Sequence, residues 1–373
     1  MTFDREHKNE GWIMDLSFSE NQLLYVETVR KLVKNSITPH ILELEKNHKF
    51  PWTIIETAWK MGIINLCIPE SVKGFDIDVF SSALIIKEIS YGDTGIATSA
   101  MCNDLANVVI SQHGTDQQKE RFLRPFVEKP LLASFCLTEP GAGSDNSMMT
   151  SFMAKRDDGA YVLNGSKCFI TNASYASQFT VLCKIGKPTG NFMACVVIPV
   201  PHVTSADLPD VGNAAREIDL PGGGKIIIGK PEDKLGQRLS NTASVTFEDV
   251  VVQPDQIIGD RRFGFKYIVD VLDYARPMVA AIGLGLAKRA LDVTIAYTRE
   301  RKQFGQRICD LPVARDMITT MWKKVELAEL ALIKAACKIQ EKADDAGIYA
   351  SLAKNTCAEA ALFCSNEGLH LHG

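Results

Sequence analysis

The hydrophobic pattern of the chain changes twice and divides it into three zones. In the first zone, from Ser19 to about Val127, apolar positions recur at the spacing of amphipathic helices, and Ser19 with Glu20 forms a helix entry signal. Strongly apolar helices are predicted over residues 81–90 and 96–113, and a polar helix is predicted over residues 116–127. The first zone is therefore predicted to be helical.

In the second zone, from Leu131 to about Gly259, short β-branched and aromatic runs are separated by Gly, Asn and Pro. Asp157-Asp-Gly159 and Asn164-Gly165 are turn signals at hairpin spacing. Strands are predicted over residues 161–163, 179–183, 193–198, 225–228 and 244–247. This zone is predicted to be an antiparallel β domain. Its segment 199–224, rich in Pro, Gly, Asp and Ala, is predicted to be a loop whose role stays open.

In the third zone, long periodic stretches over residues 264–299, 312–343 and 349–370 predict a helical bundle. The helical, β, helical order argues against alternating βαβ units and against a Rossmann sheet. We expect an α+β multidomain protein. Its predicted parts are an N-terminal helical domain over 14–130, a central β domain over 131–260 and a C-terminal bundle over 261–373.

The composition narrows the function classes without choosing one. The chain has 373 residues, 46% hydrophobic and 23% charged, which suits a globular protein with a large core. The net charge of −4 gives no basic field for nucleic acid or an anionic membrane, and no apolar run reaches membrane-spanning length. The ten cysteines are scattered without zinc spacing, which predicts reduced thiols in a cytoplasmic protein and no metal site.

One string suggests a ligand-binding loop. Thr138-Glu-Pro-Gly-Ala-Gly-Ser-Asp145 follows the strand-like run 131–137. It offers two hydroxyls, a forced turn and two glycines that let the backbone approach a ligand. Such a loop can present N–H groups to a phosphate or to a carbonyl of a heterocycle. Taken alone, the string is also compatible with a plain turn, and it is not a P-loop because no Gly-Lys-Ser/Thr follows.

Two further strings carry aromatic and charged residues. Asn164–Asn172 is predicted to be a hairpin turn feeding a strand that ends on Phe169 and Thr171. Arg299–Gly305 follows a long helix, and its cations could pair with a diphosphate or form a solvated helix end.

These three strings occur in the order, and at about the separation, found in the acyl-CoA dehydrogenase family. Leu235–Arg238, Phe247–Val252 and Asp273–Pro277 also resemble that family, and the likeness runs from about Met14 to Gly373. The resemblance implies FAD held between the β domain and the bundle, a homotetramer and an acyl-CoA substrate. It also implies electron transfer to an electron-transfer flavoprotein.

The resemblance further implies roles for single residues. The positions that match contacts to the flavin or to the thioester end of the acyl-CoA are Phe135, Leu137, Thr138 and Ser144. Phe169 and Thr171 match the aromatic and the hydroxyl beside the flavin ring. Many relatives have Trp at Phe169, so stacking is expected over a smaller area.

Two more pairs of residues lie in the third zone. Arg301 and Phe304 match residues that grip the FAD of a neighbouring subunit. Asp273 and Arg276 fall where the family contacts the CoA arm and the thioester region.

The implied reaction needs a carboxylate that removes a proton made acidic by the thioester carbonyl, while hydride goes to the flavin. Most relatives supply it as Glu in a Tyr-Glu-Gly string near the C-terminus. This chain stops at Gly373 before that string would arrive, so we expect it to be short of its native end. The second position that the family uses for the base is Ala275 here, which cannot serve.

Asp104 is the internal candidate for the base. It lies in an apolar helix whose family counterpart lines the acyl pocket, and burial would raise its pKa toward that of a working base. Asn103 and Asn107 could orient it or simply satisfy it. The alternative is a capped or partly exposed Asp.

An Asp at this point resembles a branch of the family that oxidises alicyclic thioesters in anaerobic aromatic metabolism, such as cyclohexane- or cyclohex-1-ene-1-carboxyl-CoA. The preferred hypothesis is therefore an FAD enzyme for a cyclic acyl-CoA, with 1,2- and 1,4-dehydrogenation both open. A second hypothesis is a straight- or branched-chain fatty acyl-CoA dehydrogenase whose Glu lies beyond Gly373. A third is a flavin-binding scaffold without activity.

Overall fold

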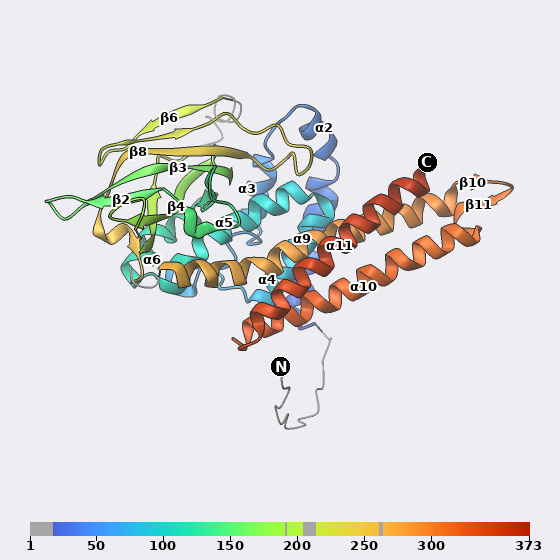
Figure 1. The fold of residues 1–373 in the computed structure, drawn as a ribbon. Helices are drawn as coiled ribbons and strands as arrows, with labels where there is room; N and C mark the ends of the chain where they lie inside the picture. The colour runs from blue at the N-terminus through green and yellow to red at the C-terminus, as the bar shows by residue number, and fades with distance from the viewer. Residues whose placement is uncertain (1–17, 191, 204–213, 261–263) are drawn as a thin grey trace, which may run out of the picture.

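The computed structural model describes residues 18–190, 192–203, 214–260 and 264–373. A group of N-terminal helices lies between a β domain and a bundle of three long helices that projects away from the sheet (Figure 1). The predicted fold class, an α+β protein in the order helical, β, helical, is confirmed. The described helices include none that is both long and apolar enough to cross a membrane.

The N-terminal helices start as the sequence predicts. The Ser19 hydroxyl accepts the Gln22 N–H in a capping box that begins the first helix. The segment 116–127 is two helices rather than the one predicted, because Pro125 has no N–H with which to continue the first of them. The helices are α1 (Glu20–Leu32), the π-helical η1 (Val33–Ile37), α2 (Ile41–Lys46), α3 (Trp52–Lys60), η2 (Glu70–Val72), α4 (Val79–Gly92), α5 (Thr94–His113), α6 (Asp116–Phe122) and α7 (Arg124–Glu128).

The β domain is one nine-stranded sheet in which β6, β7, β8, β3, β2, β4, β5 and β9 follow one another, while β1 pairs with β4. Its pairs are antiparallel except β1–β4 and β2–β4, which are parallel. The strands are β1 (Leu132–Cys136), β2 (Phe152–Lys155), β3 (Tyr161–Thr171), β4 (Ala176–Ile185), β5 (Met193–Pro199), β6 (Arg216–Asp219), β7 (Lys225–Ile228), β8 (Thr242–Val252) and β9 (Ile257–Ile258).

The prediction of a hairpin turn at Asn164-Gly165 is wrong. Both residues lie inside β3, where the pairing with β8 shifts register between Leu163 and Gly165. Gly165 has a φ of 149°, which glycine adopts readily, and a Cβ there would overlap the Ser151 side chain. Asn164 hydrogen-bonds across to Asp249, so these two residues form a β-bulge.

The predicted loop over 199–224 is also partly wrong, because residues 216–219 form β6 and pair with β7 along its whole length. Residues 204–213 of that segment lie outside the described residues. The turn predicted at Asp157-Asp-Gly159 is confirmed, since it connects the antiparallel strands β2 and β3.

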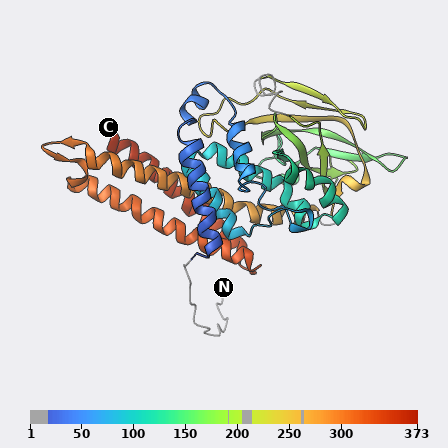
Figure 2. The same ribbon diagram turned by 180° about the vertical axis from the view of Figure 1, so that it is seen from behind.

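The bundle consists of α9 (Gly264–Glu300), α10 (Pro312–Gln340) and α11 (Ala346–His372). The small hairpin of β10 (Lys302–Gln303) and β11 (Gln306–Arg307) joins α9 to α10 at the end of the molecule farthest from the sheet (Figures 1 and 2). α9 crosses α4 at Gly285, where any Cβ would overlap the Lys87 carbonyl oxygen. Ser90 Oγ donates a hydrogen bond of 2.6 Å to the Ile282 carbonyl at the same crossing.

Polar side chains fasten α5 to the sheet. Asn103 accepts the Ala133 N–H of β1 at 2.5 Å, and the Thr180 hydroxyl of β4 donates to the Ala106 carbonyl at 2.8 Å. All ten cysteines are free in the structure, and seven of them are buried. Helix α5 is thus held in a fixed position between the sheet and the loop that precedes α4.

Candidate functional site

Two of the predicted strings meet at one edge of the β domain. The Cys168 N–H donates to the Thr138 carbonyl at 3.0 Å, and the Ser134 hydroxyl donates to the Thr171 carbonyl at 2.7 Å. The end of β1 therefore lies beside the end of β3. The structure brings the Thr138–Asp145 loop next to Phe169 and Thr171, as the family resemblance implied.

A buried ion pair supports this loop from below. Lys167 Nζ donates to Glu139 Oε1 at 2.8 Å and to the Leu137 carbonyl at 3.0 Å, and both charged side chains are almost inaccessible. Glu139 also accepts the backbone N–H groups of Thr150 and Ser151. Burial acts to raise the pKa of Glu139, but Lys167 and these hydrogen bonds outweigh it and lower the pKa to about 2. Glu139 is thus a structural carboxylate.

A bulge in β3 turns Phe169 outward. The register with β8 shifts between Lys167 and Ile170, and Phe169 has a φ of 58°, which is rare for a bulky residue. Its side chain is 67% exposed. A large apolar ring held in a strained conformation at the surface indicates a ligand contact, because strain of this kind concentrates at functional sites.

The donor set at this edge suits the flavin that the sequence predicts. The hydroxyl residues Thr138 and Thr171 are half-buried and Ser144 is exposed, and together they offer donors beside an aromatic face. A Cβ built on Gly141 or Gly143 meets no atom within 4 Å, so the backbone of the loop is open to a ligand. Phe135 and Leu137 extend this wall from β1, with Phe135 buried and Leu137 half-buried.

Asp104 lies on α5, the helix that Asn103 links to β1, and only 2% of it is exposed. Its Oδ1 accepts the Cys67 N–H at 3.0 Å, and the Cys67 thiol donates to the Asp104 carbonyl at 3.6 Å. Burial raises the pKa of Asp104 to about 6, although the backbone N–H groups of Cys67 and Leu66 act against the rise. Asp104 is therefore a buried carboxyl whose ionised form is destabilised, as predicted, and the alternative of a partly exposed Asp is wrong.

The suggestion that Asn103 or Asn107 orients Asp104 is wrong. The Asn103 side chain donates to the Asn65 side chain and the Leu131 carbonyl, and it accepts the Ala133 N–H. The side-chain oxygen of Asn107 accepts from the Gln178 amide. The Asn103 amide therefore hydrogen-bonds the start of β1, and the Asn107 amide hydrogen-bonds β4.

Tyr274 of α9 is a second buried titratable residue, and the charge of Asp104 affects it. Its pKa is raised well above the usual range by burial and then by the negative charge of Asp104. Ser82 is also close, yet the Tyr274 hydroxyl has no well-formed hydrogen bond within the described residues. Sequence reasoning did not single out Tyr274, although it stands inside the string Asp273–Pro277 and its helical spacing could have placed it on a buried face.

Asp273 and Arg276 flank Tyr274 on α9 and form an ion pair with each other. Both side chains are about one third exposed, so they lie where α9 reaches the surface. Arg301 and Phe304 behave differently. They lie in the tip hairpin, with Phe304 89% exposed, at the opposite end of the molecule from β1 and β3. One chain therefore does not bring them to the site at Thr138 and Phe169.

Comparison with known families gives three matches along the chain. The acyl-CoA dehydrogenase N-terminal domain matches residues 19–129, the middle domain matches residues 134–250 and the C-terminal domain matches residues 262–373. A probable acyl-CoA dehydrogenase of Bacillus subtilis is 32% identical over 365 residues, which are 96% of this chain and 90% of that protein.

Two solved structures extend the likeness. Butyryl-CoA dehydrogenase from Megasphaera elsdenii aligns with a TM-score of 0.86 at 31% identity, covering 96% of this chain and 90% of that one. An acyl-CoA dehydrogenase from Bacillus anthracis complexed with FAD aligns with a TM-score of 0.82 at 25% identity, covering 96% of this chain and 60% of that one.

Proposed function

The chain belongs to the acyl-CoA dehydrogenase family and is an FAD-dependent oxidoreductase, and we propose that it oxidises a cyclic acyl-CoA with Asp104 as the base. The acyl group that we propose is a six-membered ring such as cyclohexane- or cyclohex-1-ene-1-carboxyl. The observation that carries the proposal is the state of Asp104, a buried carboxyl that has no cationic partner among the described residues.

Three acidic side chains are buried in the described residues, and two of them are neutralised. Glu88 pairs with Arg30 and Lys87, and Glu139 pairs with Lys167. Asp104 forms no ion pair in the described part of the chain, and its pKa of about 6 lies near the working pH of a cell. A carboxylate that gains a proton this readily suits general base catalysis.

We assign the FAD site to the edge where β1 and β3 end. Phe169 would stack against the flavin, and the hydroxyls of Thr138, Ser144 and Thr171 would donate or accept at its polar edge. Phe135 and Leu137 would form the apolar wall beneath it. When bound, FAD supplies the acceptor for the substrate hydride.

The substrate would enter between this edge and α9. Asp273 and Arg276 would bind the CoA arm at the surface, with Ser144 near the thioester. The acyl group would then reach toward Asp104 and Tyr274. In a ring, the proton and the hydride leave carbons whose geometry differs from that of a straight chain, so a base on the α5 wall suits a ring.

A second candidate is a straight-chain acyl-CoA dehydrogenase, favoured by the likeness to butyryl-CoA dehydrogenase from Megasphaera elsdenii. In that case Asp104 would be structural, holding the loop before α4 through the Leu66 and Cys67 N–H groups. We further propose a homotetramer in which Arg301 and Phe304 contact the FAD of a neighbouring subunit. Its electron acceptor would be an electron-transfer flavoprotein.

The substrate proposal is tested by anaerobic reduction of the FAD-loaded protein with a panel of thioesters. The panel holds butyryl-, octanoyl-, isovaleryl-, cyclohexanecarboxyl- and cyclohex-1-ene-1-carboxyl-CoA, and the readout is loss of flavin absorbance. We expect the cyclic thioesters to reduce the flavin fastest. Faster reduction by butyryl- or octanoyl-CoA would overturn the cyclic substrate in favour of the second candidate, and no reduction by any thioester would overturn both.

A further inference from the structure

We propose that a cleft between α1, α4 and α9 binds a small phosphate-bearing anion, at a site separate from the FAD and acyl-CoA site. The cleft has a volume of about 490 Å³, within the range of small-molecule pockets. Lys288 and Arg289 line it, and Arg289 lies 13 residues beyond Arg276, which is about 20 Å along α9. The residues of the FAD site do not line it.

The lining is cationic in a protein that is acidic as a whole. Five of its side chains carry positive charge, and two, Glu88 and Asp292, carry negative charge, which leaves +3. Including Glu329, which reaches Lys87 from α10, the balance is still +2, against −4 for the whole chain. The five cations are Arg30, Lys34, Lys87, Lys288 and Arg289. A local surplus of this kind draws anions.

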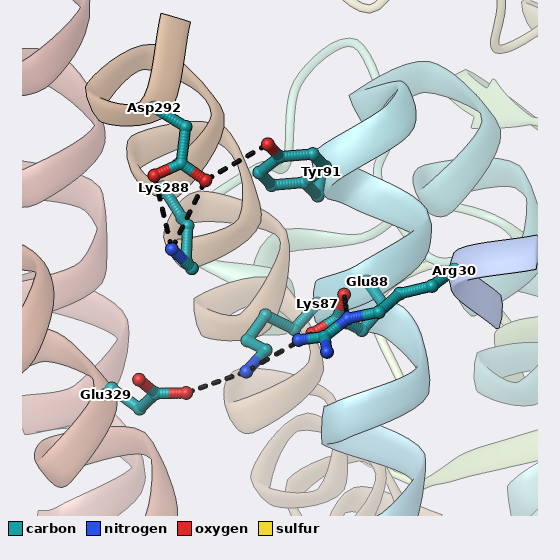
Figure 3. A network of polar contacts seen from close by, with 7 residues as sticks. All are labelled: Arg30, Lys87, Glu88, Tyr91, Lys288, Asp292 and Glu329. Atoms are coloured by element: carbon teal, nitrogen blue, oxygen red, sulfur yellow. Dashed lines mark hydrogen bonds and ion pairs between the residues drawn. The ribbon is translucent and has the colours of Figure 1, made fainter. Parts of the chain in front are cut away.

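Each carboxylate in the cleft already has partners. Figure 3 shows Glu88 held by the Arg30 guanidinium, with N–O distances of 2.9 and 3.1 Å. Asp292 accepts from the Tyr91 hydroxyl at 3.0 Å and from Lys288 at 3.3 Å. The oxygens of both carboxylates are therefore already hydrogen-bonded, so the cleft is better suited to an anion than to a cation.

Several of the cations have N–H donors that no described carboxylate pairs with. Lys87 is only 8% exposed; its ammonium hydrogen-bonds Glu329 at 2.7 Å and lies 3.6 Å from a Glu88 oxygen, which leaves part of its donor capacity unused in the described residues. Lys34 has no carboxylate partner within the described ranges, and Arg289 has its guanidinium 5.2 Å from the centre of the Tyr91 ring. Buried ammonium groups seek further acceptors because an unmade bond of a charged donor is costly.

The helix crossing creates this arrangement. Because Gly285 lets α9 approach the backbone of α4, the lysines at 87 and 288 face one cleft from two helices, and α1 adds Arg30 and Lys34. Arginine forks and lysine point charges are the groups that bind phosphate oxygens. A phosphate or diphosphate offers such oxygens to the cations of all three helices.

The proposal is tested by calorimetric titration of the FAD-loaded protein with pyrophosphate and with ADP. We compare the wild-type chain with Lys34→Gln and Arg289→Gln. The matched control is Lys31→Gln, which removes a lysine one turn earlier on α1 that is paired with Glu27 and lies outside the cleft. We expect pyrophosphate and ADP to bind the wild type and the control alike, and each cleft variant to bind about tenfold more weakly.

Absence of binding by both probes at millimolar concentration would overturn the proposal. Equal binding by the cleft variants and the wild type would also overturn it, because the anion would then occupy another site. Lys34 is exposed, so Lys34→Glu keeps the fold testable if Arg289→Gln does not fold, and it should weaken binding further than Lys34→Gln.

Discussion

Phe169 shows what a single residue reveals about this site. Its proposed place beside the flavin rests on the family resemblance, but its exposure and positive φ come from a bulge that no hydrophobic pattern indicates. The Glu139–Lys167 ion pair could not be predicted from the sequence either, because its partners are 28 residues apart and meet only when β1 and β3 lie side by side. Sequence patterns report periodicity along one element, whereas these features depend on contacts between two.

Replacing Phe169 tests the flavin wall. We expect Phe169→Ala to weaken FAD binding about tenfold, because it removes the stacking surface, and Phe169→Trp to retain or improve it. Equilibrium titration of apoprotein with FAD measures both. Unchanged affinity in Phe169→Ala would place the flavin elsewhere.

The Glu139–Lys167 pair should dominate the stability of the loop. We expect Glu139→Gln to lower the free energy of unfolding by about 3–5 kcal/mol at neutral pH, because it leaves the buried Lys167 charge uncompensated. The exposed pair of Lys225 and Glu217 is the control, and Lys225→Gln should cost below about 1 kcal/mol. Urea unfolding measures both values.

The same pair predicts a pH dependence. The folded pKa of Glu139 is lowered to about 2 from 4.5, so its stabilising contribution is complete above pH 4.5 and is lost as the pH falls toward 2. The difference in unfolding free energy between wild type and Glu139→Gln should therefore shrink through that window. A constant difference would mean that the carboxylate charge is not what stabilises the loop.

At the scale of elements, the predicted helices and strands were largely found, and the failures have local causes. Pro125 divides one predicted helix, and the Asn164-Gly165 pair forms a bulge rather than a turn because Asn164 bonds to Asp249 on β8. A dipeptide that favours positive φ serves a bulge as well as a hairpin, and only the pairing partner decides between them.

The crossing of α4 and α9 depends on Gly285. We expect Gly285→Val to lower the unfolding free energy by about 1–3 kcal/mol, because its Cβ would overlap the Lys87 carbonyl and lie 2.7 Å from Ser90 Cβ. Gly347→Ala on α11 is the control, since its nearest neighbour is an Asp273 oxygen at 3.7 Å, and it should change stability by less than about 0.5 kcal/mol. Thermal and urea unfolding measure the stability of both variants, and equal stability would show that the helix crossing does not require glycine at position 285.

At the scale of the whole molecule, the separation of Arg301 and Phe304 from the β1–β3 edge is the informative feature. Their residue types and order were readable from the sequence, but their position at the far tip of the bundle depends on how three domains pack. The homotetramer proposed above, in which these residues contact the FAD of a neighbouring subunit, would account for their distance from the β1–β3 edge.

Complementation tests that arrangement. One chain carries Arg301→Gln with Phe304→Ala, and the other carries Thr138→Ala with Phe169→Ala. Each alone should bind FAD weakly. Co-assembled chains should regain about one quarter of the sites, because half of the pairs are mixed and each mixed pair has one intact site out of two. Recovery no better than the average of the two parents would contradict a shared site.

The central claim is that Asp104 removes the substrate proton. The most direct measurement is the anaerobic rate of flavin reduction by cyclohex-1-ene-1-carboxyl-CoA as a function of pH, in wild type, Asp104→Asn and Asp93→Asn. Asp93 caps α5, and Asn is also a good cap, so this variant controls for changes to the helix.

We predict that the wild-type rate falls as the pH drops below about 6, because Asp104 then carries a proton and cannot accept another. Asp104→Asn should be slower by about a hundredfold or more at every pH and should lose this dependence, while Asp93→Asn follows the wild type. A wild-type rate and pH profile in Asp104→Asn would contradict the account and leave Asp104 a structural residue.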